Sequence, residues 1–184
     1  EVAATLAFST IANNDKVGVI FFSDKIEKYI PAQKGKTHVL HIIRELLSFE
    51  PNSKGTDMAQ ALQYFANAQK RHCTAFLISD FIGAGAVDKP LLIASNRHEV
   101  NAIQIYDRRE AELPNIGLVK FHDAESDKDL WIDTSLATVR DDYAQAWKQN
   151  QDSLEQLFTR TGVNHISVRT DEDYVKALMH LFRC

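Results

Sequence analysis

Three short apolar runs constrain the fold of this chain more than any other feature. They are KVGVIFFS (16–23), CTAFLISD (73–80) and EVNAIQIYD (99–107), which are rich in β-branched and aromatic residues and lack polar alternation. Such runs are typical of strands covered on both faces, as in a parallel sheet. Amphipathic stretches with a helical period, 37–49 and 56–71, separate the first two runs. This alternation predicts an α/β fold with a mostly parallel sheet and helices on both faces.

The rest of the chain supplies further helices and strands. A hairpin turn at Asp24 and Lys25 predicts an edge strand after the first apolar run, and Gly162 predicts the end of a long helix that starts near residue 135. Thr170 and Asp173 resemble a capping box before the last helix. The other predicted elements are a helix at 1–12, a helix at 89–97, two strands around an acidic turn at 117–133, and a strand at 164–170.

Composition limits the classes of function. A chain of 184 residues with 45% hydrophobic side chains predicts one domain spanning residues 1–184. A net charge of -4 argues against nucleic acid as a partner, because there is no basic surplus to neutralise phosphates. The apolar runs are shorter than the roughly 20 residues that span a bilayer, so we expect no membrane contact. The two cysteines form no CxxC motif or disulfide framework, which favours a reducing, cytoplasmic location.

Candidate functional residues lie where strands end and helices begin. Asp80 and Asp107 each end a predicted strand, at the sheet edge where open α/β folds bind ligands. Thr56 lies just before a predicted helix, and Gly55 would allow close approach of a ligand. A hydroxyl and a carboxylate at one edge suit a hard divalent cation such as Mg²⁺. The alternative is structural: Thr56 as a helix N-cap and Asp80 as a turn residue.

Several motifs together resemble a known family. NDKVGVIFFSDKIEKYIPAQKGKTHVLHIIRELL, GTDMAQAL, FLISDF, RHEVNAIQIYD, LWIDTS and TDEDYVKAL occur in this order along nearly the whole chain. They resemble a von Willebrand factor A-type domain, specifically the bacterial family called domain of unknown function fifty-eight. The resemblance implies a three-layer α/β/α sandwich, Rossmann-like, with one antiparallel edge strand in a mostly parallel central sheet.

The same resemblance implies a metal-ion-dependent adhesion site. Family members build it from an Asp-x-Ser-x-Ser loop, a Thr and an Asp, and here Thr56 and Asp80 match the second and third elements. The sequence contains no Asp-x-Ser-x-Ser loop, and Asp24 follows a different strand and lacks the serines. We therefore expect a domain truncated at its N-terminus, without its first central strand, whose two neighbouring strands keep unpaired edges. We also expect binding of Mg²⁺ or another divalent cation to be weak or absent in this fragment.

The expected function is protein interaction without catalysis. Proteins that look like this one are commonly encoded beside MoxR-type AAA+ ATPases, which implies such an ATPase as partner in assembly or chaperone-like work. Candidate partner-binding residues are Gly55, Asp57, Arg108 and Arg109, the two arginines in a segment expected to be a solvated loop. The alternative is a Rossmann-like enzyme that uses a nucleotide or small molecule. Against it, the chain lacks a complete phosphate-binding loop, since the third glycine position of FIGAGAVD is Asp88.

Overall fold

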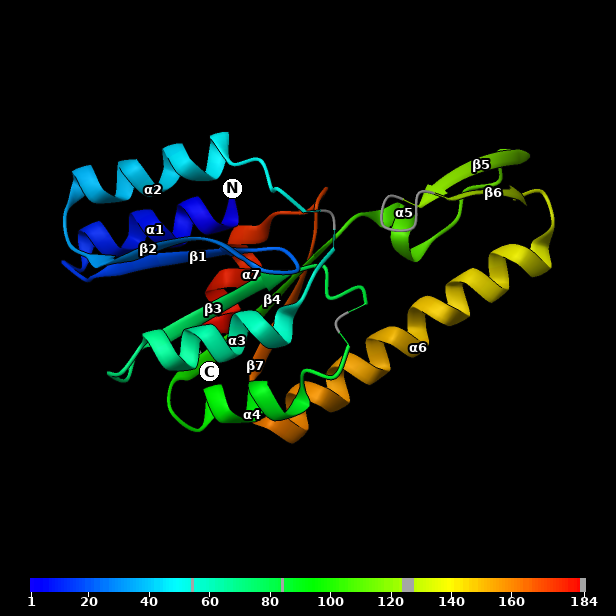
Figure 1. The fold of residues 1–184 in the computed structure, drawn as a ribbon. Helices are drawn as coiled ribbons and strands as arrows, with labels where there is room; N and C mark the ends of the chain where they lie inside the picture. Colours follow the sequence, from blue (N-terminus) through cyan, green and yellow to red (C-terminus); the bar gives the residue numbers. More distant parts are fainter. Residues whose placement is uncertain (54, 84, 124–127, 183–184) are drawn as a thin grey trace. The chain divides into compact units, whose positions relative to one another are not determined.

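The computed structural model describes residues 1–53, 55–83, 85–123 and 128–182, and Figure 1 shows their helices and strands. The chain divides into two compact units. Unit one comprises Glu1–Arg71 and Gly83–Pro90, and unit two comprises His72–Ile82 and Leu91–Cys184. The units are described separately below. The expectation of a single domain over residues 1–184 stays a prediction.

Unit one combines a β-hairpin with three helices. Its elements are α1 (Val2–Ala12), β1 (Val17–Phe22), β2 (Ile26–Gln33), α2 (Lys36–Ser48) and α3 (Met58–Ala68). A core of Phe21, Ile30 and Ile42 joins the hairpin to α2, and Phe21 stacks on Phe49 with 4.7 Å between ring centroids. Burial of these side chains stabilises the unit because each removes apolar surface from water. The predicted edge strand and the helices on either side of it are confirmed.

The first apolar run does not form a parallel strand covered on both faces. β1 pairs antiparallel with β2, and Phe21 is its one buried residue. Gly18 explains part of this geometry, because a Cβ there would lie 2.8 Å from both Ala32 N and Ile30 O. Because β1 has a neighbouring strand on one side only, most of its residues are half-buried. The burial predicted from its uniformly apolar sequence was therefore too high.

Unit two is built on a parallel sheet of three strands. β4 (Glu99–Tyr106) lies between β3 (Thr74–Ser79) and β7 (Asn164–Arg169), and the register aligns Ile78 with Ile103 and Ile103 with Ile166. β4 has five consecutive buried residues, whereas β3 has none. The difference follows from position, since β4 has a strand on each side. The predicted α/β class with parallel strands is confirmed.

Two helices cover opposite faces of this sheet (Figure 1). On one face, Phe158 of α6 (Ala137–Thr161) packs against His165 with 4.9 Å between ring centroids. On the other, Phe182, the C-cap of α7 (Tyr174–Leu181), meets Phe76 edge-on at 5.8 Å. Residues in neighbouring positions of a strand point to opposite faces, which places α6 and α7 on different sides.

Of the two helix ends predicted from the sequence, the C-terminal end of α6 is confirmed and the N-terminal cap of α7 is wrong. α6 ends at Gly162, as predicted, in the left-handed conformation with φ 67°. The cap of α7 is Asp173, whose carboxylate accepts a hydrogen bond from Val175 N. The capping box predicted from Thr170 is therefore wrong, because the Thr170 hydroxyl instead donates to Asp107 Oδ2 at 3.2 Å.

Among the described residues, every strand except β4 keeps one open edge. β1 pairs only with β2, and β3 pairs only with β4. The strands are thus distributed over separate ladders: β1–β2, β3–β4–β7, and a hairpin of β5 (Leu118–Asp123) and β6 (Lys128–Asp133). Because β2, β5, β6 and β7 have open edges as well as β1 and β3, the expected absence of a first central strand stays a prediction. The remaining helices are α4 (Asp88–Ser95) and α5 (Arg108–Ala111).

Candidate interaction site

Thr56 lies in the loop before α3 of unit one and is exposed. It does not cap the helix. The cap is Asp57, whose Oδ1 accepts a hydrogen bond of 2.9 Å from Gln60 N. The structural alternative for Thr56 is therefore wrong, and the part of the chain described here gives no hydrogen-bond partner to its hydroxyl. That oxygen is available to a ligand.

Polar contacts hold this loop against the β1–β2 hairpin. Asp57 N donates to Ser23 O at 2.8 Å, and Asn52 donates from its backbone and side chain to both oxygens of Glu27. The Asn52 side chain, followed by Ser23, holds the pKa of the Glu27 carboxyl below its usual value. At Gly55, an added Cβ would meet only Asp24 Cβ, at an ordinary 3.5 Å. The loop is thus positioned by side-chain bonds, and unit one itself does not require a glycine at 55.

Asp80 directly follows β3 at the carboxyl end of the parallel sheet of unit two, and it is exposed. Its Oδ1 accepts from Ile82 N at 3.0 Å, which is the turn role expected of it. Its backbone carbonyl accepts from the buried side chain of Gln104 at 3.2 Å. Oδ2 has no hydrogen bond to any residue that the structure describes. Asp80 is therefore held firmly while one carboxylate oxygen stays available.

The residue after Asp80 has an unusual backbone. Phe81 has φ 59°, a left-handed conformation that costs energy for a bulky side chain. Its ring is 2% exposed and packs edge-on against Phe158 at 5.3 Å. Burial of the ring offsets the backbone strain and fixes the turn that carries Asp80.

Thr56 and Asp80 belong to different units, so each is placed only within its own unit. No group of three or more His, Cys, Asp or Glu side chains suited to a metal ion occurs in the residues covered by the structure. Asp107, the other acid at a strand end, is fully engaged: Oδ1 accepts from Arg109 N at 2.8 Å and Oδ2 from Thr170.

The segment after β4 forms a helix where the sequence predicted a solvated loop. α5 covers only four residues and is held by a capping box, in which Asp107 accepts from the helix backbone and Glu110 accepts from Asp107 N. Tyr143 of α6 donates to Arg109 O at 3.2 Å. Burial, with a smaller effect from the Glu110 charge, raises the pKa of the Tyr143 hydroxyl, so this donor keeps its proton.

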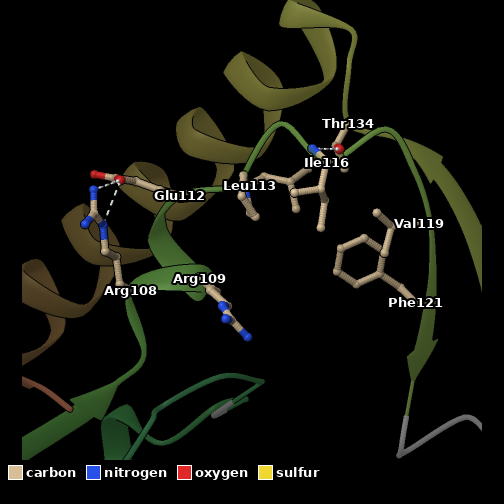
Figure 2. A pocket seen from close by; sticks show the side chains of 9 residues that line it. Arg108, Arg109, Glu112, Leu113, Ile116, Val119, Phe121 and Thr134 are labelled. Atoms are coloured by element: carbon tan, nitrogen blue, oxygen red, sulfur yellow. Dashed lines mark hydrogen bonds and ion pairs between the residues drawn. The ribbon is translucent and has the colours of Figure 1, made fainter. Parts of the chain in front are cut away.

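Arg108 and Arg109 line a cavity of about 650 Å³ in unit two, shown in Figure 2. We call it the α5–hairpin cavity; its walls come from α5, the loop that follows, and β5. Its apolar lining includes Leu113, Ile116, Val119 and Phe121. The volume falls within the roughly 300–1,000 Å³ that is typical of ligand pockets.

The two arginines differ in their electrostatic surroundings. Arg108 donates two hydrogen bonds, of 3.1 and 3.2 Å, to the same oxygen of Glu112. For the guanidinium of Arg109, the described residues supply no ion pair, and Figure 2 shows it extending into the open part of the cavity. The lining therefore has two guanidinium groups against one carboxylate, and its positive charge is concentrated at Arg109.

A single buried threonine fastens the loop to the hairpin. Thr134 is fully buried, and its hydroxyl donates to Gly117 O at 2.7 Å and accepts from Ile116 N at 3.0 Å. These bonds set the direction in which Ile116 enters the cavity wall. Sequence reasoning missed Thr134 because its partners lie 17 and 18 residues away, and no local pattern marks it.

The cavity adjoins a strongly apolar hairpin. Val119 and Phe121 share one face of β5, and Phe121 pairs directly with Leu130 of β6. Large apolar side chains in this region are more than half exposed, namely Ile116 (66%), Leu118 (65%), Leu130 (60%), Trp131 (61%) and Leu136 (51%). Such a density of exposed apolar surface marks an interaction region more often than a solvated one.

Comparison with protein families places the chain in one of them. The family described as "Protein of unknown function DUF58" matches residues 1–153, which is most of the sequence. The chain belongs to the DUF58 family. The expected family membership is thereby confirmed at this level.

Relatives of similar sequence occur in mycobacteria. The chain is 30% identical over 177 residues to an uncharacterized protein of Mycobacterium tuberculosis, covering 94% of this chain and 55% of that protein. It is also 30% identical over 158 residues to an uncharacterized protein of Mycobacterium avium, covering 84% of this chain and 92% of the relative. The chain thus spans about half the length of the first of these relatives.

Solved structures share the fold. An aerotolerance-related membrane protein of Bacteroides fragilis aligns with TM-score 0.60 and 16% identity, over 99% of this chain and 87% of that one. The conserved hypothetical protein BatB of Bacteroides thetaiotaomicron aligns with TM-score 0.55 and 16% identity, over 99% and 86%. At this identity the likeness concerns the fold alone. In the described part of this chain, no helix has both the length and the apolar character needed to cross a membrane.

Proposed function

We propose that this DUF58 chain is a protein-interaction module of the von Willebrand factor A type, without enzymatic activity. The observation that carries the proposal is Asp80, an exposed carboxylate after a parallel strand, with Oδ1 fixed by Ile82 N and Oδ2 without a described partner. An oxygen presented at this edge is suited to bind a cation that in turn binds a partner's carboxylate.

Thr56 and Asp80 are the proposed metal-binding residues in this chain. Both offer oxygen atoms, the ligand type that Mg²⁺ prefers, and the hydroxyl of Thr56 is not used as a helix cap. Mg²⁺ keeps several water molecules and often takes only one or two protein carboxylates, so a small ligand set is compatible with it. A bound cation would supply an open coordination position for an acidic partner. Within this chain, Gly55 and Asp57 are proposed to contact the partner beside Thr56, and Gly55 would allow its close approach.

A further part of this proposal concerns β1 and β3, which have one open edge like every described strand except β4. Each strand has an unused ladder of backbone donors and acceptors, and an additional strand would satisfy them. We propose that a strand followed by an Asp-x-Ser-x-Ser loop, supplied by another segment or molecule, completes the metal site. In this form the protein would work in the cytoplasm with a MoxR-type AAA+ ATPase in assembly or a chaperone-like role.

The test is calorimetric titration of Mg²⁺ and Mn²⁺ into this chain and into a form extended upstream through that strand and loop. We expect binding by the extended form, with little or none by the shorter one. Asp80→Ala should weaken binding about tenfold or more, since a charged ligand contributes roughly 1.5–3 kcal/mol. Asp142→Ala, which removes an exposed carboxylate from α6, is the matched control and should leave affinity unchanged.

Two results would contradict the proposal. Unchanged affinity in Asp80→Ala would remove Asp80 from the site, and absence of binding by both forms would leave Thr56 and Asp80 without a metal role. The partnership has its own readout, because a purified MoxR-type ATPase should bind the extended form in Mg²⁺ and lose that binding in Asp80→Ala.

A further inference from the structure

The α5–hairpin cavity has features that the proposed metal site does not use. It lies wholly in unit two, and it combines an apolar wall with an arginine that lacks an ion pair in the described structure. A ligand that carries a carboxylate close to an apolar group would match both the arginine and the apolar wall of this lining. A guanidinium group recognises a carboxylate with particular geometric fit, because its planar fork matches the two oxygens.

The apolar wall is rigidly placed. Leu113 is 8% exposed, and Thr134 holds the loop that carries Ile116 through bonds to Gly117 O and Ile116 N. On the other side, Val119 and Phe121 stand on one face of β5, which the ladder with β6 keeps in register. A preformed wall of this kind lowers the entropy lost when a ligand is bound.

The charge of the cavity is concentrated on Arg109. Its backbone is fixed at both ends, since Arg109 N donates to Asp107 Oδ1 and its carbonyl accepts from Tyr143. Its guanidinium extends into the cavity (Figure 2), whereas Arg108 is already paired with Glu112. Arg109 is therefore the group that would meet an incoming carboxylate.

The exposed apolar surface continues beyond the cavity. Leu130 lies directly across from Phe121, and Ile116 is 66% exposed at the cavity rim. A small molecule that filled the cavity would leave these side chains in water, whereas a polypeptide segment would cover them. The occupant that fits the whole surface is thus a protein segment rather than a small carboxylate.

A membrane surface fits less well. Residues 123–129 have the sequence DAESDKD, with four acidic residues and one lysine. An anionic lipid surface would repel these acidic residues along the whole hairpin, whereas a short acidic and apolar peptide needs to contact only Arg109 and the apolar wall.

We propose that the α5–hairpin cavity binds a partner protein through a segment in which acidic residues alternate with large apolar ones. Arg109 pairs with an acidic side chain, and an apolar neighbour packs between Leu113 and Phe121. This proposal does not depend on the metal site, because it uses no residue of the Thr56 loop and no cation.

The experiment measures fluorescence anisotropy of a short labelled peptide of alternating glutamate and leucine, in buffer containing EDTA. The chelator separates this test from the metal proposal. Two further peptides replace glutamate by lysine, or leucine by serine. We expect the first peptide to bind and both others to lose binding, because each removes one of the two features that the cavity recognises.

Variants locate the binding on the cavity. Arg109→Glu should weaken affinity about tenfold or more, the effect of losing a charge-assisted bond and adding repulsion. Phe121→Ser should weaken it as well. The controls are Arg44→Glu and Leu47→Ser on α2 of unit one, which make the same kinds of change at exposed positions outside the cavity and should leave affinity unchanged. Circular dichroism of each variant checks that the fold is retained.

Other occupants give distinct results that would overturn the proposal. Decanoate that binds at Arg109 while the peptide does not would make the site one for a small amphiphilic carboxylate. A dimer in sedimentation that Arg109→Glu dissociates would make a second copy of this chain the occupant. Equal binding of the lysine peptide, or peptide binding that Arg109→Glu leaves unchanged, would remove the cavity as the recognition site.

Discussion

The central strand β4 and the β5–β6 hairpin both contain large apolar residues, but these residues have opposite surroundings. In β4, Ala102 and Ile103 are fully buried, whereas in the hairpin Leu130 and Trp131 are about three-fifths exposed, at 60% and 61%. β4 has a strand on each side and a helix over each face of its sheet, and the hairpin has only its own two strands. The comparison teaches that an apolar strand stabilises this molecule only where neighbours cover it. Where they do not, the apolar side chains stay exposed to solvent.

The largest expected effect is a difference in the free energy of unfolding between a variant in β4 and a variant in the β5–β6 hairpin. Ile103→Ala should lower the free energy of unfolding by about 2–5 kcal/mol, because it leaves a cavity in a fully covered site. Leu130→Ala should change it by no more than about 0.5 kcal/mol, since that side chain is already in water. Urea denaturation of both variants measures the difference. Equal losses would mean that the hairpin is part of the folded core.

A second pair compares polar groups. Gln104 is 3% exposed, donates to Asp80 O and accepts from the Ser167 hydroxyl at 2.8 Å. Gln104→Ala should cost about 1–3 kcal/mol, because it removes a buried side chain together with its hydrogen bonds to Asp80 and Ser167. The hairpin counterpart is the exposed ion pair between Lys120 and Asp129 at 2.7 Å, and Lys120→Ala should cost about 0–1 kcal/mol. Thermal unfolding would contradict this order if Lys120→Ala were the more destabilising change.

The smallest effect concerns pH at the end of the hairpin. The Ser135 hydroxyl, followed by the Ser135 backbone N–H, lowers the pKa of the Asp133 carboxyl below its ordinary 3.8. Because the pKa of Asp133 is lower in the folded state than in the unfolded state, its ionised carboxylate stabilises the fold at pH values above the unfolded-state pKa. This stabilisation is lost as the pH falls through the lowered, folded-state pKa.

An NMR titration of the Ser135 amide should therefore show its midpoint below pH 3.8, with the β4 amides unaffected. Asp133→Asn should abolish the transition. A midpoint at or above that value would show that the Ser135 contacts do not hold in solution.

Sequence patterns predicted the elements whose signals are local. The end of α6 at Gly162 and the paired strands of residues 117–133 follow from a left-handed cap and from β-branched runs around a turn. The middle of that turn, residues 124–127, lies outside the described residues. Burial was harder to predict, because it depends on how many strands flank a run, and neither β1 nor β3 is covered on both sides.

The candidate site was predicted only in part for a similar reason. Arg108 and Arg109 were identified as partner-binding candidates, but α5 was missed because four residues are too few to show a helical period. Its capping box, Asp107 with Glu110, was the available signal. The choice of Asp57 over Thr56 as cap was open, since both residues are good caps. The cavity itself joins segments that are distant in sequence, so no local pattern predicts it.

The length of α6 has a mechanical consequence. At about 1.5 Å per residue, its 25 residues make a rod of roughly 37 Å. Its first turn is anchored beside the hairpin, where Arg140 donates to the carbonyl of Thr134 at 2.7 Å, and Phe158 near its last turn packs against Phe81. The helix therefore acts as a rigid spacer between the hairpin and the parallel sheet of unit two (Figure 1).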